Sequence, residues 1–258
     1  MKLTTIGCWG AYPYRDGGTT SYLLTGQGGF QLLIDAGSRA VTELEKEISP
    51  LDLDAVIISH YHPDHVADLG VLRHYFQLYP RHLWATKVLP IYGHNEDQYE
   101  FEKLSLSGVS DGIAYNVDSV EKIGPFDITF IKTIHPVVCY AMRIVERETG
   151  QILVFTGDTG YFDGLEEFTK GADLFLADVY LYEGNENHIA HLTSKEAGLI
   201  AATAGVKKLV LTHIPPLPPE GIDPENHLDI LKKETEKYAV GVPVELAKPH
   251  KSWDLGAL

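Results

Sequence analysis

The six residues His60-Tyr61-His62-Pro63-Asp64-His65 place three imidazoles and a carboxylate within one short loop. Zinc and similar divalent ions favour these ligand types, and ligands so close in sequence lose little chain entropy on coming together. Alternate positions of an extended segment face the same way, so His60 and His62 can share one ion. Asp64 and His65 follow the turn at Pro63 and can hold a second ion. The alternative is a plain polar loop, but the apolar run 54–59 before it is typical of a buried strand that ends at a ligand cluster.

Two coordination shells need more ligands than one loop supplies. Three further apolar runs, typical of strands, end at a histidine or an aspartate beside a glycine or a proline. They place His135 after 128–134, Asp158 after 152–155 and His213 after 208–212. Open α/β layers carry their ligand sites at such strand ends. Taken singly, each histidine could be an ordinary loop residue and the aspartate a turn former, but together with the first loop they predict one shared site.

The order of these residues resembles the metallo-β-lactamase superfamily: a His-x-His-x-Asp-His loop, a lone His, an Asp after Gly and a final His. The likeness covers nearly the whole chain and includes Leu32-Leu33-Ile34-Asp35-Ala36-Gly37, which is similar to that family's strand and Asp-x-Gly turn. The resemblance implies an α/β fold, a four-layer αββα sandwich in which helices cover the outer faces of two facing sheets. It also implies the ligand sets: His60, His62 and His135 for one metal, Asp64, His65 and His213 for the other, and Asp158 as the bridge.

Hydrophobic periodicity predicts the elements of this fold. We expect strands near 2–8, 21–25, 30–35, 54–58, 83–85, 126–134, 137–146, 151–156, 174–178 and 207–212. We expect helices near 39–48, 66–76, 162–169, 194–204 and 225–237, and a helix followed by a loop within 94–116. No linker divides the sequence, so residues 1–258 are expected to form a single domain.

Composition sets further limits. A chain of 258 residues with 44% hydrophobic content can bury a sizeable core. No apolar run approaches the roughly 20 residues that cross a bilayer, and residues 1–4 begin a strand rather than a signal peptide, so we expect a cytoplasmic protein without a membrane partner. Cys8 and Cys139 lie on separate predicted strands, which favours free thiols and a reducing compartment. Dimers are common in the family that the chain resembles, and a homodimer remains open.

The expected cofactors are two divalent ions, zinc first, with manganese or iron as alternatives. A water between two such ions falls in pKa from about 15.7 toward about 7, and so supplies a bridging hydroxide nucleophile at neutral pH. Asp64 is expected to orient that hydroxide while it binds metal. The chain is therefore expected to be a metal-dependent hydrolase.

A proton donor for the leaving group is expected at His191. This histidine precedes a predicted helix that Thr193 or Ser194 can cap, and Asp178 at the end of 174–178 can hold it in its cationic form. Ordinary structural roles are the alternative for both residues. The segment resembles the tRNase Z and phosphodiesterase branch of the superfamily, where a His-x-Thr loop and an acidic residue on the preceding strand end transfer protons. That likeness assigns His191 and Asp178 to catalysis.

The chain also departs from tRNase Z. It reads Ala177-Asp178-Val179-Tyr180 where that family has His-Glu-Ala-Thr, and only 22 residues separate His135 from Asp158, too few for the arm that grips tRNA. A formal net charge of −15 opposes binding of a large polyanion. We therefore expect a small phosphodiester or nucleotide as substrate, or a short RNA. The alternatives are a lactone or ester hydrolase, a tRNA 3′-processing endonuclease and, least favoured, a non-enzymatic metal or ligand sensor.

One further histidine is suited to contact substrate. His94 follows Ile91-Tyr92-Gly93, a segment that resembles the superfamily's loop beside the metal pocket. The other unassigned histidines lack ligand-like neighbours in the sequence and are expected to be surface or core residues.

Overall fold

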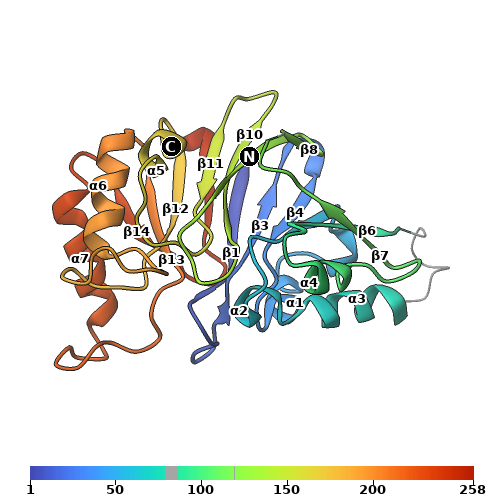
Figure 1. Cartoon of the computed structure of the whole chain (residues 1–258), viewed down its shortest axis with the longest axis horizontal. Helices are drawn as coiled ribbons and strands as arrows, with labels where there is room; N and C mark the ends of the chain where they lie inside the picture. The colour runs from blue at the N-terminus through green and yellow to red at the C-terminus, as the bar shows by residue number, and fades with distance from the viewer. Residues whose placement is uncertain (79–86, 119) are drawn as a thin grey trace.

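The computed structural model describes residues 1–78, 87–118 and 120–258. Two β-sheets lie face to face at its centre, and helices cover the outer face of each sheet (Figure 1). The predicted four-layer αββα sandwich is therefore confirmed.

The first sheet has the strand order β15-β1-β3-β4-β5-β6-β7, with β2 paired to β1. Strands β4 to β7 run parallel, whereas β1, β3 and β4 pair antiparallel. The carboxyl end of β5 therefore delivers the loop that starts at His60. The strands are β1 (Lys2–Trp9), β2 (Gly18–Thr19), β3 (Ser21–Thr25), β4 (Gln31–Ile34), β5 (Ala55–Ile57), β6 (Leu89–Gly93), β7 (Ser110–Ala114) and β15 (Ser252–Asp254).

The second sheet has the order β14-β13-β12-β11-β10-β9-β8. Strands β11 to β14 are parallel, so their carboxyl ends meet at one edge, where Asp158, Asp178 and His213 lie. The strands are β8 (Glu121–Ile123), β9 (Phe126–Lys132), β10 (Tyr140–Glu146), β11 (Ile152–Phe155), β12 (Leu174–Asp178), β13 (Leu209–Thr212) and β14 (Val244–Leu246).

The helices divide between the two sheets (Figure 1). The first sheet is covered by α1 (Ala40–Leu44), α2 (Pro63–Val66), α3 (Leu69–Leu78) and α4 (Gln98–Glu102), and the second by α5 (Leu165–Thr169), α6 (Ser194–Ala204) and α7 (His227–Tyr238). A capping box between Thr193 and Glu196 starts α6, which satisfies two backbone donors at its first turn. Within the described ranges, no helix is both long and apolar enough to cross a membrane.

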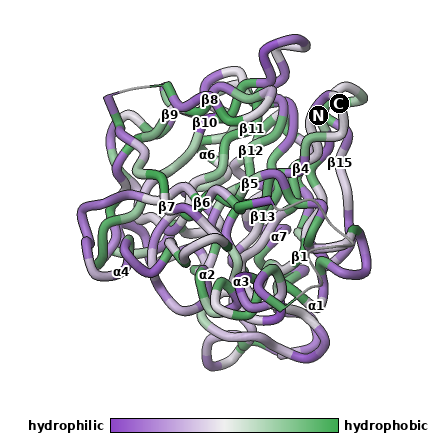
Figure 2. The backbone as a smooth tube through the Cα atoms, turned by 90° about the vertical axis from the view of Figure 1, so that its right-hand side faces the viewer, coloured by the Kyte–Doolittle hydropathy of each residue, from purple (hydrophilic) through white to green (hydrophobic). Residues whose placement is uncertain are grey.

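Alternating side chains of the strands build two hydrophobic clusters. Tyr22 and Leu24 of β3 point into the core between the sheets, whereas Leu23 points toward the cluster under α1 and α3. Across the sheet interface, the ring of Tyr22 meets Phe155 edge to face at a centroid distance of 5.3 Å. Figure 2 shows hydrophobic segments concentrated in the central strands and hydrophilic segments in many outer loops. This packing fixes the two sheets, and with them the loops at their edges.

Several predicted elements differ from those observed. The expected helix 66–76 is two helices, α2 and α3, and Asp68 between them bonds through its backbone N–H to the Ala36 carbonyl. The expected helix 39–48 is shorter, since α1 ends at Leu44. The loop expected after the helix in 94–116 is wrong, because β7 forms there, and β6, β8, β14 and β15 were not predicted. The expected strand 83–85 lies outside the described residues.

Candidate metal centre

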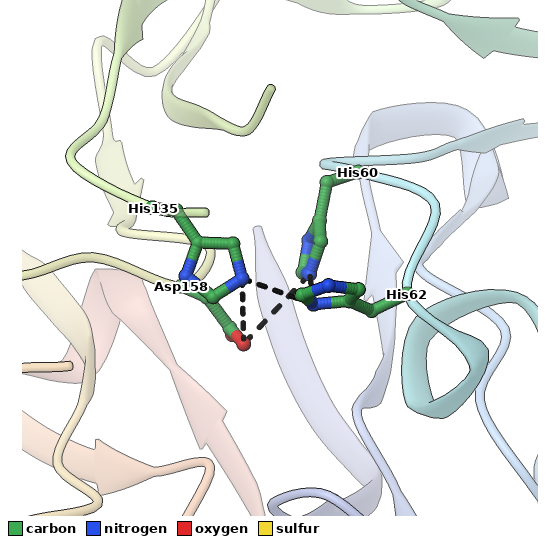
Figure 3. A group of neighbouring side chains, drawn as sticks. All are labelled: His60, His62, His135 and Asp158. Carbon is green, nitrogen blue, oxygen red and sulfur yellow. Dashed lines mark hydrogen bonds and ion pairs between the residues drawn. The ribbon is translucent and has the colours of Figure 1, made fainter. Parts of the chain in front are cut away.

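Loops from both sheets bring His60, His62, His135 and Asp158 together (Figure 3). The Nδ1 atom of His62 lies 3.1 Å from His60 Nε2 and 3.0 Å from His135 Nε2. The Asp158 Oδ2 atom lies 3.8 Å from His60 Nε2 and 3.9 Å from His135 Nε2. Ligand atoms of a tetrahedral zinc site with bonds of about 2.05 Å are roughly 3.3 Å apart. The group therefore has the spacing of one coordination shell.

A second group shares Asp158 and adds Asp64, His65 and His213. His213 Nε2 lies 3.0 Å from Asp64 Oδ2 and 3.3 Å from Asp158 Oδ2, and His65 Nε2 lies 3.2 Å from Asp158 Oδ1. His65 Nε2 and Asp158 Oδ1 are buried, and although they lie close to each other, neither makes a hydrogen bond of good geometry with any described residue. Orphaned buried atoms of this kind call for a ligand. The donor set, nitrogen and carboxylate oxygen, suits a divalent metal.

The electrostatics differ between the two groups. Burial lowers the pKa of His60, His62 and His135, so their imidazoles are neutral, as metal ligation requires. Burial acts to raise the pKa of Asp64 and Asp158, but neighbouring histidines, His213 foremost, outweigh it and hold both carboxyls ionised.

In the second group, nearby carboxylates outweigh burial, so that Asp158 and Asp35 raise the pKa of His65 to about 10 and Asp158 and Asp178 raise the pKa of His213. Metal binding to the second group therefore releases the protons of these two histidines.

Asp35, at the end of β4, supports the centre from outside. Its buried carboxylate accepts hydrogen bonds from the backbone N–H and the hydroxyl of Ser59, both at 2.7 Å, and from His65 Nδ1 at 2.8 Å. Because His65 Nδ1 makes this hydrogen bond, the other ring nitrogen, Nε2, faces the two groups of metal ligands. The backbone is strained at Asp35, with a φ of 56°, and at His213, with a φ of 48°. Residues with such strained backbones cluster at functional sites. The Asp-x-Gly turn at Asp35 is the sequence signal for this position, but the contact of Asp35 with His65 was not predicted.

Asp35→Asn is expected to lower the affinity for divalent metal by about 10–100-fold, because the amide supplies a weaker acceptor for the His65 N–H. Competition with a coloured chelator measures this change. Asp127→Asn, which alters a surface carboxylate paired with Arg147, serves as the control. Equal metal affinities for the two variants would show that Asp35 has no part in holding the centre.

The loop after β1 also contacts the centre, which the sequence analysis missed. The backbone N–H of Ala11 donates a hydrogen bond of 2.8 Å to Asp64 Oδ2. A Cβ on Gly10 would lie 2.8 Å from the His213 ring, so only glycine lets the chain pass this close. Neither Gly10 nor Ala11 has a polar side chain, so the sequence carries no signal for their contacts with the centre.

The predicted pair His191 and Asp178 lies beside the second metal group. His191 Nδ1 is 2.9 Å from Asp178 Oδ2, and the other carboxylate oxygen is 3.3 Å from His213 Nδ1. The rings of His191 and His213 stack at a centroid distance of 5.2 Å. Asp178 is fully buried, whereas His191 keeps part of its side chain exposed. The predicted site residues thus lie together, with the His191 imidazole accessible at the edge of the cluster.

Comparison with known proteins agrees with this geometry. Residues 14–213 match the metallo-beta-lactamase superfamily. The chain is 40% identical over 255 residues to the probable metallo-hydrolase YhfI of Bacillus subtilis (strain 168), covering 98% of this chain and 100% of that protein. The crystal structure of YhfI matches with a TM-score of 0.88 at 39% identity, over 98% of this chain and 99% of that one.

Two more distant structures share the fold. The short form of human tRNase Z matches with a TM-score of 0.73 at 20% identity over 99% of each chain. A diphosphatase from the PhnP family matches with a TM-score of 0.74 at 17% identity, over 98% of this chain and 97% of that one. At these identities the likeness shows the fold alone. Because the family match spans most of the sequence and the similarity to YhfI nearly all of it, the chain belongs to the metallo-β-lactamase superfamily.

Proposed function

We propose that the protein is a hydrolase with a dinuclear metal centre that cleaves a small phosphodiester. The proposal of two metal ions rests on one observation: four carboxylates are buried around one centre. Each is at most 8% exposed, and in the described part of the chain their ion-pair partners are all histidines: Asp35, Asp64, Asp158 and Asp178. Buried carboxylates without cations are costly. Two divalent ions would balance these four negative charges.

The residues divide between the two ions as the family likeness implies. His60, His62 and His135 would hold one ion, Asp64, His65 and His213 the other, and Asp158 both. When bound, two such ions lower the pKa of a water between them toward about 7 and make hydroxide available at neutral pH. Zinc suits this donor set, with manganese and iron as alternatives.

Asp64 and His191 would act on the attacking water and on the leaving group. The Ala11 N–H holds Asp64 at the centre, where its carboxylate can orient the attacking water. In its imidazolium form His191 would donate its Nδ1–H to Asp178 and carry a second proton on Nε2, which it can give to the leaving oxygen. An alkoxide that leaves phosphorus needs such a proton, and the presence of this pair favours the phosphodiester over an ester with a good leaving group.

Charge and topology support a small substrate. The net charge of −15 repels a folded RNA. The antiparallel strands β10 and β11 and the turn between them occupy residues 140–155, most of the 22 residues between His135 and Asp158, which leaves no room for a nucleic-acid-binding insertion there. We therefore propose a small phosphodiester or nucleotide, with short RNA as the upper limit of size.

The direct test compares the hydrolysis of bis(p-nitrophenyl) phosphate with that of a simple lactone by metal-reconstituted protein. Asp64→Ala provides the background, since it removes a proposed ligand and the water-orienting group together. We expect metal-dependent turnover of the phosphodiester that vanishes in the variant. Turnover of the lactone alone would contradict the phosphodiesterase proposal and favour an ester hydrolase. It would also contradict the role of His191 as proton donor to the leaving group.

A further inference from the structure

A cavity of about 540 Å³ lies beside the metal centre, within the size range of small-molecule sites. His62 of the first metal group lines it, so the cavity opens onto the proposed reaction site. One wall comes from the segment directly after His135 and consists of Pro136, Val137 and Val138. Another wall comes from the connection between β6 and α4 and from the first turn of α4. The first of these walls is apolar, and the second is acidic.

The wall formed by the β6–α4 connection and the first turn of α4 is acidic and contains Glu96, Asp97 and Glu100. Lys132 pairs with Glu96 at 2.7 Å and Lys103 with Glu100 at 2.6 Å, but neither lysine lines the cavity. None of the described residues that line it is a lysine or an arginine. A second phosphate placed here would face three carboxylates, two of them ion-paired, and no lysine or arginine of the described lining.

His94, between the acidic wall and Tyr61, has hydrogen-bonding capacity left over. It is 3% exposed, and neither of its ring nitrogens has a hydrogen-bond partner among the described residues. Burial lowers the pKa of His94 and outweighs the opposing effect of the nearby Glu96 carboxylate. A neutral imidazole offers one donor and one acceptor. The ring of Tyr61 lies 4.6 Å from that of His94, so the lining is also aromatic.

We infer that this cavity receives the substituent of the phosphodiester that does not leave, and that it selects a neutral or cationic ring with hydrogen-bonding groups, such as a nucleobase. The apolar wall and the aromatic rings pack against the ring, and His94 and Gln98 are neutral side chains of the lining that can form hydrogen bonds to it. The acidic wall rejects a substituent that carries a further phosphate. This inference rests on the proposed function and names the substrate class within it.

The test uses two substrates with the same leaving group, the p-nitrophenyl ester of thymidine 5′-phosphate and its 3′-phosphorylated form. We expect kcat/KM to be lower for the 3′-phosphorylated ester by roughly tenfold or more, because like charges repel at the binding site. The triple variant Glu96→Gln/Asp97→Asn/Glu100→Gln should bring the two rates to within about twofold. The change Asp97→Asn should retain the N-terminal cap of α4, since asparagine caps helices as well as aspartate does.

A matched control removes the same number of charges elsewhere. Glu167→Gln/Glu225→Gln/Glu236→Gln changes exposed carboxylates outside this cavity and should keep the wild-type ratio of the two rates. A ratio that falls equally in both triple variants would assign the discrimination to overall charge and overturn the inference. Equal kcat/KM for the two esters with wild-type protein would overturn it as well.

Calorimetric binding separates this inference from the proposed function. Thymidine 5′-phosphate should bind to the metal-reconstituted protein more tightly than thymidine 3′,5′-bisphosphate, and this order should disappear in the Glu96/Asp97/Glu100 variant. The predicted order of affinities without turnover of either ester would sustain the cavity's selectivity and refute the phosphodiesterase. Equal or tighter binding of the bisphosphate would refute the selectivity whatever the turnover.

Discussion

Asp158→Ala is expected to reduce the metal content from two ions per chain to one or none, and to slow phosphodiester turnover on the order of a thousandfold. Asp158 approaches both ligand groups, within 3.9 Å of His135 on one side and 3.3 Å of His213 on the other. No other side chain belongs to both groups in the described residues. Losing one ion removes several kcal/mol of transition-state stabilisation, and each 1.36 kcal/mol is about tenfold in rate.

Elemental analysis of the purified variant after metal reconstitution measures the first effect, and the p-nitrophenolate assay measures the second. Asp163→Ala, an exposed aspartate in the segment before α5, controls for the substitution itself and should retain both ions. Circular dichroism checks that the variant is folded. Two ions bound at wild-type affinity in Asp158→Ala would rule out the shared ligand and require the two groups to be filled independently.

The parts of the site that the sequence predicted are those with a local signal. His60, His62, Asp64 and His65 stand in one loop, and a polar residue at the end of an apolar run marks Asp158 and His213. Ala11 and Asp64 are 53 positions apart, and Ala11 contributes a backbone N–H to their contact. The residue types at these positions therefore do not predict the contact. Contacts of this kind depend on how the two sheets pack, which periodicity does not encode.

The same distinction explains the errors in the secondary structure. Ser110-Asp111-Gly112 at the start of β7 has low β propensity, and it forms a strand because β6 offers a free edge with a parallel register. The break between α2 and α3 depends on Asp68, whose carboxylate accepts from the Val41 N–H and whose N–H donates to Ala36. In both places a long-range contact overrides the local pattern.

The strained backbones of Asp35 and His213 connect the fold to the chemistry. Each residue follows a parallel strand, one in each sheet, and each holds its side chain against the metal groups. A hydrogen bond from the Ile214 N–H to the Cys8 carbonyl fixes the chain just after His213 and ties the second sheet to the first. The sandwich therefore supplies the packing that keeps the turns of Asp35 and His213 in an unfavourable conformation.

His191→Ala is expected to keep both metals and to slow hydrolysis by about 10²–10⁴-fold for phosphodiesters with an alkoxide leaving group. His191 is placed for this role because Asp178 holds its Nδ1 at 2.9 Å, its ring stacks on that of His213, and part of its side chain is exposed. A p-nitrophenolate leaves readily without a proton, so its release should slow by less than about tenfold. The loss should therefore depend on the leaving group.

A series of phosphodiesters whose leaving groups range from p-nitrophenol to simple alcohols measures this dependence as the slope of log kcat against leaving-group pKa. The slope should become steeper in His191→Ala and stay unchanged in His188→Ala, a neighbouring exposed histidine that stacks on His191 but makes no described contact with Asp178. Equal slowing across the series would mean that His191 positions substrate or supports His213 through Asp178. A steeper slope with both metals retained is the result that only proton donation produces, because a purely structural defect at Asp178 would reach His213 and lower metal content as well.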